Sequence, residues 1–167
     1  MENSLKKQFL VDTSAFISLE SVNLLKQVIN LFNIITVNSV INELKDFSKH
    51  NDKYGIIAKR VLKFTNKISM EDTDVKEQIR YLQNTNNELF NLALKKKIPL
   101  VSDDHKLVHH TKDKIDIYFS TFFLTAFVTA EIISKKESLG MLEKLRDIRN
   151  WKNNIIYLTT KEELEKL

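Results

Sequence analysis

Short runs of apolar, partly β-branched residues are the feature that most limits how this chain can fold. They lie at residues 9–11, 34–37, 98–101 and 115–117, and each has the length and composition of a buried strand. Stretches with helical apolar spacing separate them. Strands without a polar face occur mainly in parallel sheets that helices cover on both sides. The pattern therefore predicts a three-layer α/β/α sandwich with a central, mainly parallel sheet.

The segments between these runs predict the helices. Apolar residues at helical spacing fill residues 15–32, and the charged segment 70–82 is a further candidate helix. The residues expected to cap helices are Asn38 or Ser39, and Asn86 or Asn87. Beyond residue 117 we expect the chain to be mostly helical.

The chain offers few places for a domain boundary. Its 167 residues contain two glycines and one proline, and no linker, internal repeat or low-complexity tract interrupts it. With 43% hydrophobic residues it has enough apolar material for a core. We therefore expect one domain over residues 1–167.

Composition excludes several classes of function. The sequence has no cysteine, which excludes a disulfide scaffold, a thiolate metal site and a cysteine nucleophile. Two isolated glycines cannot form a phosphate-binding loop or the elbow around a serine nucleophile. P-loop enzymes, Rossmann dehydrogenases and serine hydrolases of that kind are therefore excluded.

The longest apolar stretch, residues 117–133, contains several hydroxyl side chains and is shorter than the roughly 20 residues of a membrane helix. We expect it to be a buried helix or to form a homodimer surface through residues 118–133. The polar N-terminus shows no signal peptide. These features predict a cytoplasmic protein without a membrane partner.

Acidic residues follow the apolar runs where each strand would end. Asp12 follows the first run and Asp103 and Asp104 follow the third, while Glu43 lies in the first turns of the helix after the second run. The carboxyl ends of parallel strands face the crevice where ligands bind. We therefore expect these carboxylates to meet in one cleft.

Clustered carboxylates repel one another unless a hard cation neutralises them. The cluster therefore predicts a Mg²⁺ or Mn²⁺ site, and such an ion lowers the pKa of an attacking water and stabilises charge on a phosphate. Taken singly, Asp12 is also explained as a helix cap and Glu43 as a solvated surface acid.

Four segments, in order, resemble the motifs of PIN domains. They are V-D-T-S-A-F-I at 11–17, S-V-I-N-E-L at 39–44, N-E-L-F-N-L-A-L at 87–94 and I-P-L-V-S-D-D-H-K-L at 98–107. The resemblance covers residues 9 to about 120, and residues 134–167 resemble the helical C-terminal extension of some prokaryotic PIN proteins. It implies an α/β/α nuclease whose acids hold Mg²⁺ or Mn²⁺ and cleave RNA. Many such domains are VapC-like toxins with an antitoxin partner, and others process RNA.

The resemblance also implies roles for individual acids. By position Asp12 matches the first acid of the family and Glu43 the second. Asp103 and Asp104 both match the fourth, and Asp104 is the better aligned of the two. All four are therefore predicted to be catalytic, metal-binding residues.

The third acid of the family is replaced here by Asn86. An amide oxygen can bind Mg²⁺ but brings no charge, so metal affinity and water activation are expected to weaken. Glu88 takes the place of the third acid if the start of the helix is shifted. Because two residues are about 200° apart around a helix, Asn86 and Glu88 cannot both face the cleft.

Hydroxyl and basic side chains near these motifs are candidates for RNA binding. The candidates are Thr13, Ser14, Lys49, His105 and Lys106. The net charge is +4, and 22 of the 26 cationic residues are lysines, which bind phosphate as point charges without reading bases. Lysine-rich surfaces are also common without any such role, and Thr13 and Ser14 are also explained as residues of a helix cap.

Two functions follow from this reading of the sequence. The first is a metal-dependent endoribonuclease that hydrolyses RNA with a metal-activated water, as a toxin or as an RNA-processing enzyme. The second is a catalytically weakened PIN-like domain that serves as an RNA-binding or assembly module.

Overall fold

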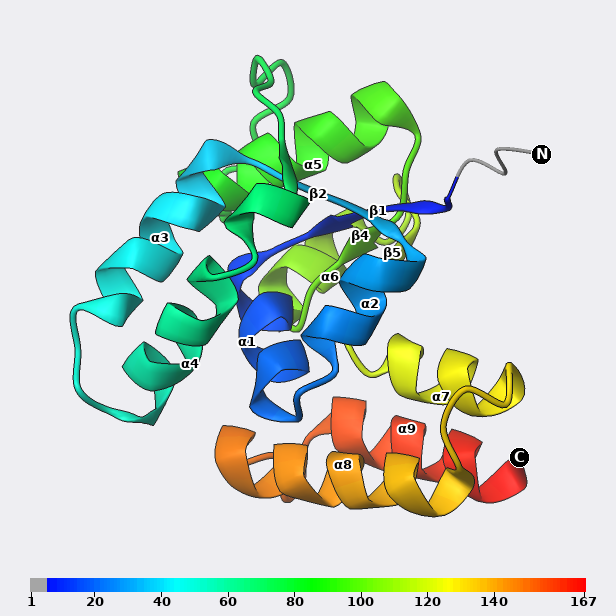
Figure 1. The fold of residues 1–167 in the computed structure, drawn as a ribbon. Helices are drawn as coiled ribbons and strands as arrows, with labels where there is room; N and C mark the ends of the chain where they lie inside the picture. Colours follow the sequence, from blue (N-terminus) through cyan, green and yellow to red (C-terminus); the bar gives the residue numbers. More distant parts are fainter. Residues whose placement is uncertain (1–5) are drawn as a thin grey trace, which may run out of the picture.

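Five short parallel strands form the centre of the structure, a computed structural model that describes residues 6–167 (Figure 1). The strands are β1 (Gln8–Val11), β2 (Asn33–Thr36), β3 (Ser69–Met70), β4 (Leu100–Val101) and β5 (Ile117–Tyr118). Their order in the sheet is β3-β2-β1-β4-β5, and every pairing is parallel. Leu10 of β1 pairs with Ile35 on one side and with Leu100 on the other. The predicted parallel sheet is confirmed.

Helices cover both faces of this sheet (Figure 1). The connections from β1 to β3 contain α1 (Thr13–Ser21), α2 (Leu25–Leu31), α3 (Asn38–Ser48), α4 (Lys53–Leu62) and the 3-10 turn η1 (Thr65–Lys67). The later connections contain α5 (Asn84–Lys96), which leads to β4, and α6 (His105–Thr111), which leads to β5. Right-handed crossovers that run in opposite directions along a sheet place their helices on opposite faces. The predicted three-layer α/β/α fold is thus confirmed.

Strand β1 is the centre of the core. Phe9, Leu10 and Val11 have no exposed surface, and the Phe9 ring lies 5.1 Å from that of Phe32 and 5.2 Å from that of Phe123 in edge-on contacts. Such aromatic pairs add to the free energy gained from burial itself. Because β1 lies between β2 and β4, the residues that follow these three strands meet at one edge of the sheet.

Three further helices follow the sheet and lie together in Figure 1, namely α7 (Phe122–Thr129), α8 (Lys135–Arg149) and α9 (Ile155–Lys166). A capping box between Ser134 and Glu137 begins α8, so the helical extension predicted over 134–167 is confirmed.

The apolar segment around α7 packs within its own chain. Phe123 and Phe127 are buried there, and α8 and α9 contact this helix. Residues 117–133 therefore form a strand and a short buried helix instead of one long helix, and the homodimer through residues 118–133 stays a prediction. Among residues 6–167, no helix is both long enough and apolar enough to cross a membrane.

Three helix boundaries differ from the expectation. Residues 15–32 form two helices because Asn23 between them has φ of 59°, in the left-handed region that a right-handed helix cannot contain. Helix α3 begins after Val37 and α5 after Gln83, and neither of these N-cap residues accepts a side-chain hydrogen bond. The asparagines and the serine expected as caps lie inside the first turns instead.

The charged segment 70–82 is not a helix. It contains the end of β3, a strand that the sequence pattern did not indicate, and then a loop fastened to α5 by two buried asparagines. Asn91 Oδ1 accepts hydrogen bonds of 2.9 Å from two successive backbone N–H groups of the loop, and Asn87 Oδ1 accepts one of 2.8 Å from the Ile79 N–H. Bonds between distant segments leave no periodic pattern in the sequence.

The two glycines should respond in opposite directions to replacement by alanine. A Cβ at Gly55 would lie 2.0 Å from the carbonyl oxygen of His50, so Gly55→Ala should lower the free energy of unfolding by about 1–3 kcal/mol. A Cβ at Gly140, which is exposed on α8, would meet no atom within 4 Å. Gly140→Ala should therefore raise the free energy of unfolding by about 0.5–1 kcal/mol. Urea denaturation of both variants measures this, and effects of the same sign would contradict it.

Candidate active site

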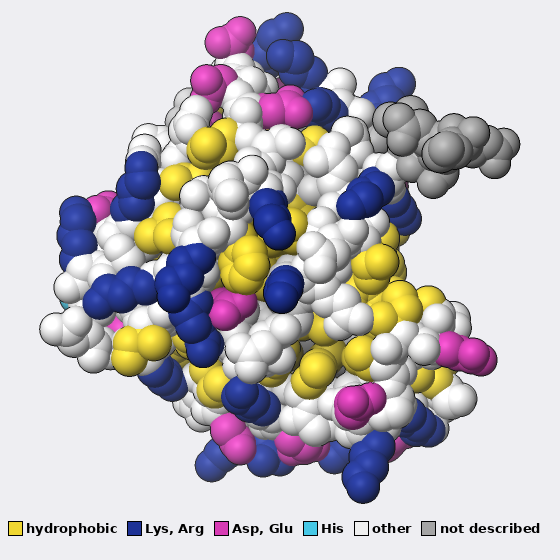
Figure 2. Space-filling view, in the orientation of Figure 1, with side chains coloured by type: hydrophobic (Ala, Val, Ile, Leu, Met, Phe, Trp, Pro, Cys, Tyr) yellow, Lys and Arg dark blue, Asp and Glu magenta, His cyan; other side chains and the backbone are white. Residues whose placement is uncertain are grey.

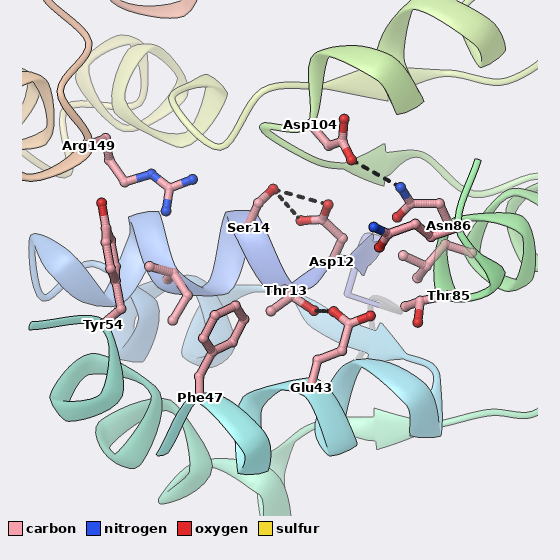
Figure 3. Close-up of a pocket in the computed structure, with 13 residues that line it drawn as sticks. Asp12, Thr13, Ser14, Glu43, Phe47, Tyr54, Thr85, Asn86, Asp104 and Arg149 are labelled. Atoms are coloured by element: carbon pink, nitrogen blue, oxygen red, sulfur yellow. Dashed lines mark hydrogen bonds between the residues drawn. The ribbon is translucent and has the colours of Figure 1, made fainter. Parts of the chain in front are cut away.

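A cavity of about 270 Å³ opens at the edge of the sheet where β1, β2 and β4 end (Figure 3). Its walls come from α1, α3, α4, α5, the residue that caps α6 and the last turn of α8. The residues that line it are Asp12, Thr13, Ser14, Ile17, Glu43, Phe47, Tyr54, Gln83, Thr85, Asn86, Leu89, Asp104 and Arg149. Six of the residues predicted from the sequence are among them, and the structure thus brings these six side chains together.

Asp12 lies at the centre of this pocket and is 4% exposed. Its Oδ1 accepts a 2.8 Å hydrogen bond from the Ala15 N–H, which makes it the N-cap of α1. The hydroxyls of Ser14 and Ser102 also donate to this carboxylate. The helix-cap role expected for Asp12 is therefore observed, and it places the same carboxylate in the pocket.

Burial raises the pKa of Asp12 from an ordinary 3.8 to about 7. The hydrogen bonds from Ser102, Ala15 and Ser14 favour the ionised form and lower the pKa, whereas the negative charge of Asp103 raises it further. Desolvation is the largest of these effects. A carboxyl group in this state gains from any cation that enters the pocket.

Glu43 reaches the same pocket from the second turn of α3 (Figure 3). Its Oε2 accepts a 2.5 Å hydrogen bond from the Thr13 hydroxyl of α1. This bond holds a half-buried carboxylate opposite Asp12 and explains why Thr13 lies at the start of α1. Glu43 is thus more than a solvated surface acid.

Asp104 and Asn86 form the third wall. Asp104 Oδ1 caps α6 by accepting from the N–H groups of Lys106 at 2.8 Å and Leu107 at 3.3 Å. Its Oδ2 accepts a 3.0 Å hydrogen bond from the Asn86 amide. Asn86 therefore donates a hydrogen bond to the Asp104 carboxylate as a neutral group. At this place the family has an acid, which would add negative charge.

Asp103 and Glu88, the two alternative acids, do not line the pocket. Asp103 is 7% exposed, and its oxygens accept hydrogen bonds of 2.8 Å from the backbone N–H and the hydroxyl of Ser120. Glu88 lies away from Asn86 around α5 and accepts a 2.6 Å hydrogen bond from Ser39 of α3. Both acids hold segments of the fold together outside the pocket, and their role as metal ligands stays a prediction.

The predicted basic RNA contacts also lie outside the pocket. Lys49 is exposed and pairs with Asp46 at 2.6 Å. His105 lies with its Nε2 3.3 Å from the side-chain amide nitrogen of Asn154, and Lys106 is exposed to solvent. His105 and Lys106 directly follow Asp104 at the start of α6, and Lys49 follows α3, but none of the three lines the cavity.

Several lining residues were missed by the sequence reasoning. They are Ile17, Phe47, Tyr54, Gln83, Thr85, Leu89 and Arg149. Phe47 and Leu89 carried a signal, since they lie one helical turn from predicted site residues. Arg149 carried none, because it reaches the pocket from the C-terminal extension.

Solved structures from three organisms resemble this fold. A PilT N-terminus domain protein from Sulfolobus solfataricus matches with a TM-score of 0.53 and 10% identity, over 71% of this chain and 92% of its own. A protein from Pyrobaculum aerophilum matches with a TM-score of 0.56 and 17% identity, over 76% and 99% of the two chains. A domain of a functionally unknown protein from Methanocaldococcus jannaschii matches with a TM-score of 0.50 and 19% identity, over 68% and 90%.

The chain has the fold of a PilT N-terminus (PIN) domain. At these identities the likeness establishes the fold, and it confirms the resemblance seen in the sequence motifs at that level. No family model matches the sequence, and no curated protein matches it.

The carboxylates of this PIN fold do not form a complete metal cage. Among residues 6–167, no group of three or more Asp, Glu, His or Cys residues is arranged to hold one ion. Mg²⁺, however, commonly takes one or two carboxylates and keeps several waters. Asp12 and Asp104, with the Asn86 amide beside them, offer oxygen donors that fit such a hydrated ion.

Asp12 should make the stability of this PIN fold depend on pH. Because its pKa is about 7 when folded and near 3.8 when unfolded, the folded state binds more protons between these values. The contribution of Asp12 to the free energy of unfolding is then fully present below about pH 4 and is lost as the pH rises through about 7. Each unit of difference in pKa corresponds to ~1.4 kcal/mol.

We therefore expect the wild type, in EDTA, to lose stability relative to Asp12→Asn between about pH 5 and about pH 8. Urea denaturation at several pH values measures the difference between the two proteins. A difference that stays constant over this range would contradict the raised pKa. Mg²⁺ at the upper pH should restore part of the lost stability of the wild type only.

Asp103 should prove structural. Asp103→Ala leaves the buried N–H and hydroxyl of Ser120 without an acceptor, which should lower the free energy of unfolding by about 1–3 kcal/mol. The matched control, Asp113→Ala, removes an exposed acid from the same part of the chain and should change it by less than about 0.5 kcal/mol. Equal stabilities of the two variants in urea would show that the Ser120 contact is unimportant.

Proposed function

We propose that this chain is a metal-dependent endoribonuclease that hydrolyses RNA phosphodiesters with a metal-activated water. The observation that carries the proposal is Asp12, a buried carboxylate whose pKa is raised to about 7. Within residues 6–167 it forms no ion pair, and it shares its pocket with Glu43 and Asp104. Strongly shifted acids in a cleft are typical of functional sites.

Asp12 and Asp104, with the Asn86 amide oxygen beside them, would hold a hydrated Mg²⁺ or Mn²⁺, and Glu43 lines the same pocket. When bound, the ion would lower the pKa of a water and offset negative charge on the phosphate. The hydroxyl of Ser14 donates to Asp12 and accepts from the Asp103 N–H at 2.9 Å, so it fixes the orientation of the Asp12 carboxylate. Thr13 does the same for Glu43.

The surface over α3 and α4, the helices that supply Glu43, Phe47 and Tyr54 to the pocket, supports an anionic substrate. Figure 2 shows Lys and Arg side chains gathered over α3 and α4, and the exposed lysines of this region are Lys45, Lys49, Lys53, Lys59 and Lys63. Lysines of this kind attract a phosphate backbone over a distance set by the salt concentration. The choice of RNA rests on the resemblance of the sequence motifs to PIN domains.

A second candidate function is favoured by Asn86. The neutral amide stands where the family has an acid, and the carboxylates around it fall short of a three-ligand group within residues 6–167. A domain of this kind would bind RNA, or assemble with other molecules, without cleaving. The predicted antitoxin partner and the cytoplasmic location apply to either candidate and stay predictions.

The test is cleavage of RNA by the purified protein with Mg²⁺ or Mn²⁺. We expect Asp12→Asn and Asp104→Asn to lower the cleavage rate by about 100-fold or more, because each removes a charged oxygen donor. Asp113→Asn, which replaces an exposed acid outside the pocket, should cleave at the wild-type rate. Cleavage that survives in EDTA or in Asp12→Asn would overturn the proposal.

Replacing Asn86 by aspartate separates the two candidates. Asn86→Asp adds negative charge beside Asp104 and should raise the affinity for Mn²⁺ by about 10-fold, read from the rise in Tm with metal concentration. Wild-type cleavage supports the nuclease. Wild-type binding without cleavage, together with cleavage by Asn86→Asp, supports the weakened module.

A further inference from the structure

We propose that Arg149, held by Tyr54, binds a phosphate next to the scissile one, and that Phe47 forms the wall against which the attached base stacks. The three residues make a nucleotide subsite that is completed by the C-terminal extension. The proposal rests on the proposed function and adds to it the group that positions the substrate.

The fold places Arg149 firmly. It is the last residue of α8, and the preceding carbonyl, that of Ile148, accepts hydrogen bonds from the Tyr54 hydroxyl at 3.1 Å and from Lys53 Nζ at 2.7 Å. Carbonyl groups in the last turn of a helix lack partners within that helix. Helix α4 supplies those partners, so it fixes the end of α8 against the pocket.

The guanidinium of Arg149 is oriented but not neutralised. Its Cζ lies 5.8 Å from the centre of the Tyr54 ring and 5.7 Å from that of the buried Trp151. Within residues 6–167 its side chain forms no hydrogen bond or ion pair, whereas Arg146, one turn earlier, contacts Glu143 and Asp147. A planar cation held by aromatic rings keeps its N–H groups available for two bonds to one phosphate.

The aromatic residues beside Arg149 offer a surface for a base. Phe47 is 44% exposed although it lies in the pocket, and Tyr54 stands next to the guanidinium in Figure 3. Bases stack on such rings whatever their sequence. An exposed ring in the same pocket as an unpaired cation fits a nucleotide, which carries a flat apolar base and a phosphate.

The pocket therefore has two ends. Figure 3 shows Asp104 and Asn86 at one end, Arg149 and Tyr54 at the other, and Asp12 between them. Charge decides which end of the pocket holds a phosphate, because the carboxylates repel phosphate in the absence of a cation and the guanidinium attracts it. A strand held at the Arg149 end presents its next phosphate to Asp12.

The experiment measures binding without cleavage. Fluorescence anisotropy in EDTA compares a labelled oligoadenylate of about 12 nucleotides with an abasic strand of the same length. The variants are Arg149→Gln and Phe47→Leu, and their controls are Lys144→Gln, an exposed cation on the same helix, and Tyr81→Leu, an exposed ring outside the pocket. The Tm of each variant shows that it is folded.

We expect Arg149→Gln to weaken binding of both strands by about 5–10-fold and to reduce the salt slope by about one charge. Phe47→Leu should weaken binding of oligoadenylate alone, because the abasic strand has nothing to stack. Losses no larger than those of the controls would overturn the subsite. Cleavage is assayed separately, so the expected binding losses in a protein that never cleaves would support the subsite and overturn the nuclease.

Discussion

The burial of the Asp12 carboxylate is the constraint on which the site depends. A buried carboxylate must be surrounded by donors, and here they come from the start of α1 and from Ser102 after β4. Ser102 also accepts the Asp104 N–H at 3.0 Å. The same bonds that satisfy one charge therefore fix the ends of β1 and β4 relative to each other, and with them the distance between Asp12 and Asp104.

In this arrangement Asp12 and Asp104 each have a structural role and also face the pocket. Asp12 caps α1 and Asp104 caps α6, and both helices begin at the carboxyl edge of the sheet. A cap uses one oxygen of the carboxylate and leaves part of the group facing the cavity. The polar start of a helix after a buried strand thus suffices to bring acids into one pocket.

The sequence could predict the features that depend on local patterns of residues. Buried runs such as residues 9–11 predicted the strands, and the acids after them predicted Asp12, Asp104 and Glu43 at one edge. It could not show that Asp103 turns to Ser120, since adjacent residues point to opposite sides and only the packing decides which side faces the pocket. Arg149 was beyond prediction because no spacing relates the end of α8 to β1. The loop after β3 was missed because its partners are the side chains of α5.

The charges of the pocket explain why the carboxylates and Arg149 belong together. Three carboxylates, of Asp12, Glu43 and Asp104, face one guanidinium, of Arg149, so the pocket alone carries net negative charge and opposes entry of a phosphate. The Asn86 amide eases this repulsion by donating to Asp104, at the expense of the charge that would bind a cation tightly. On the proposed function, a phosphate chain would reach Asp12 only with a cation beside it, while Arg149 would retain the strand from the other end.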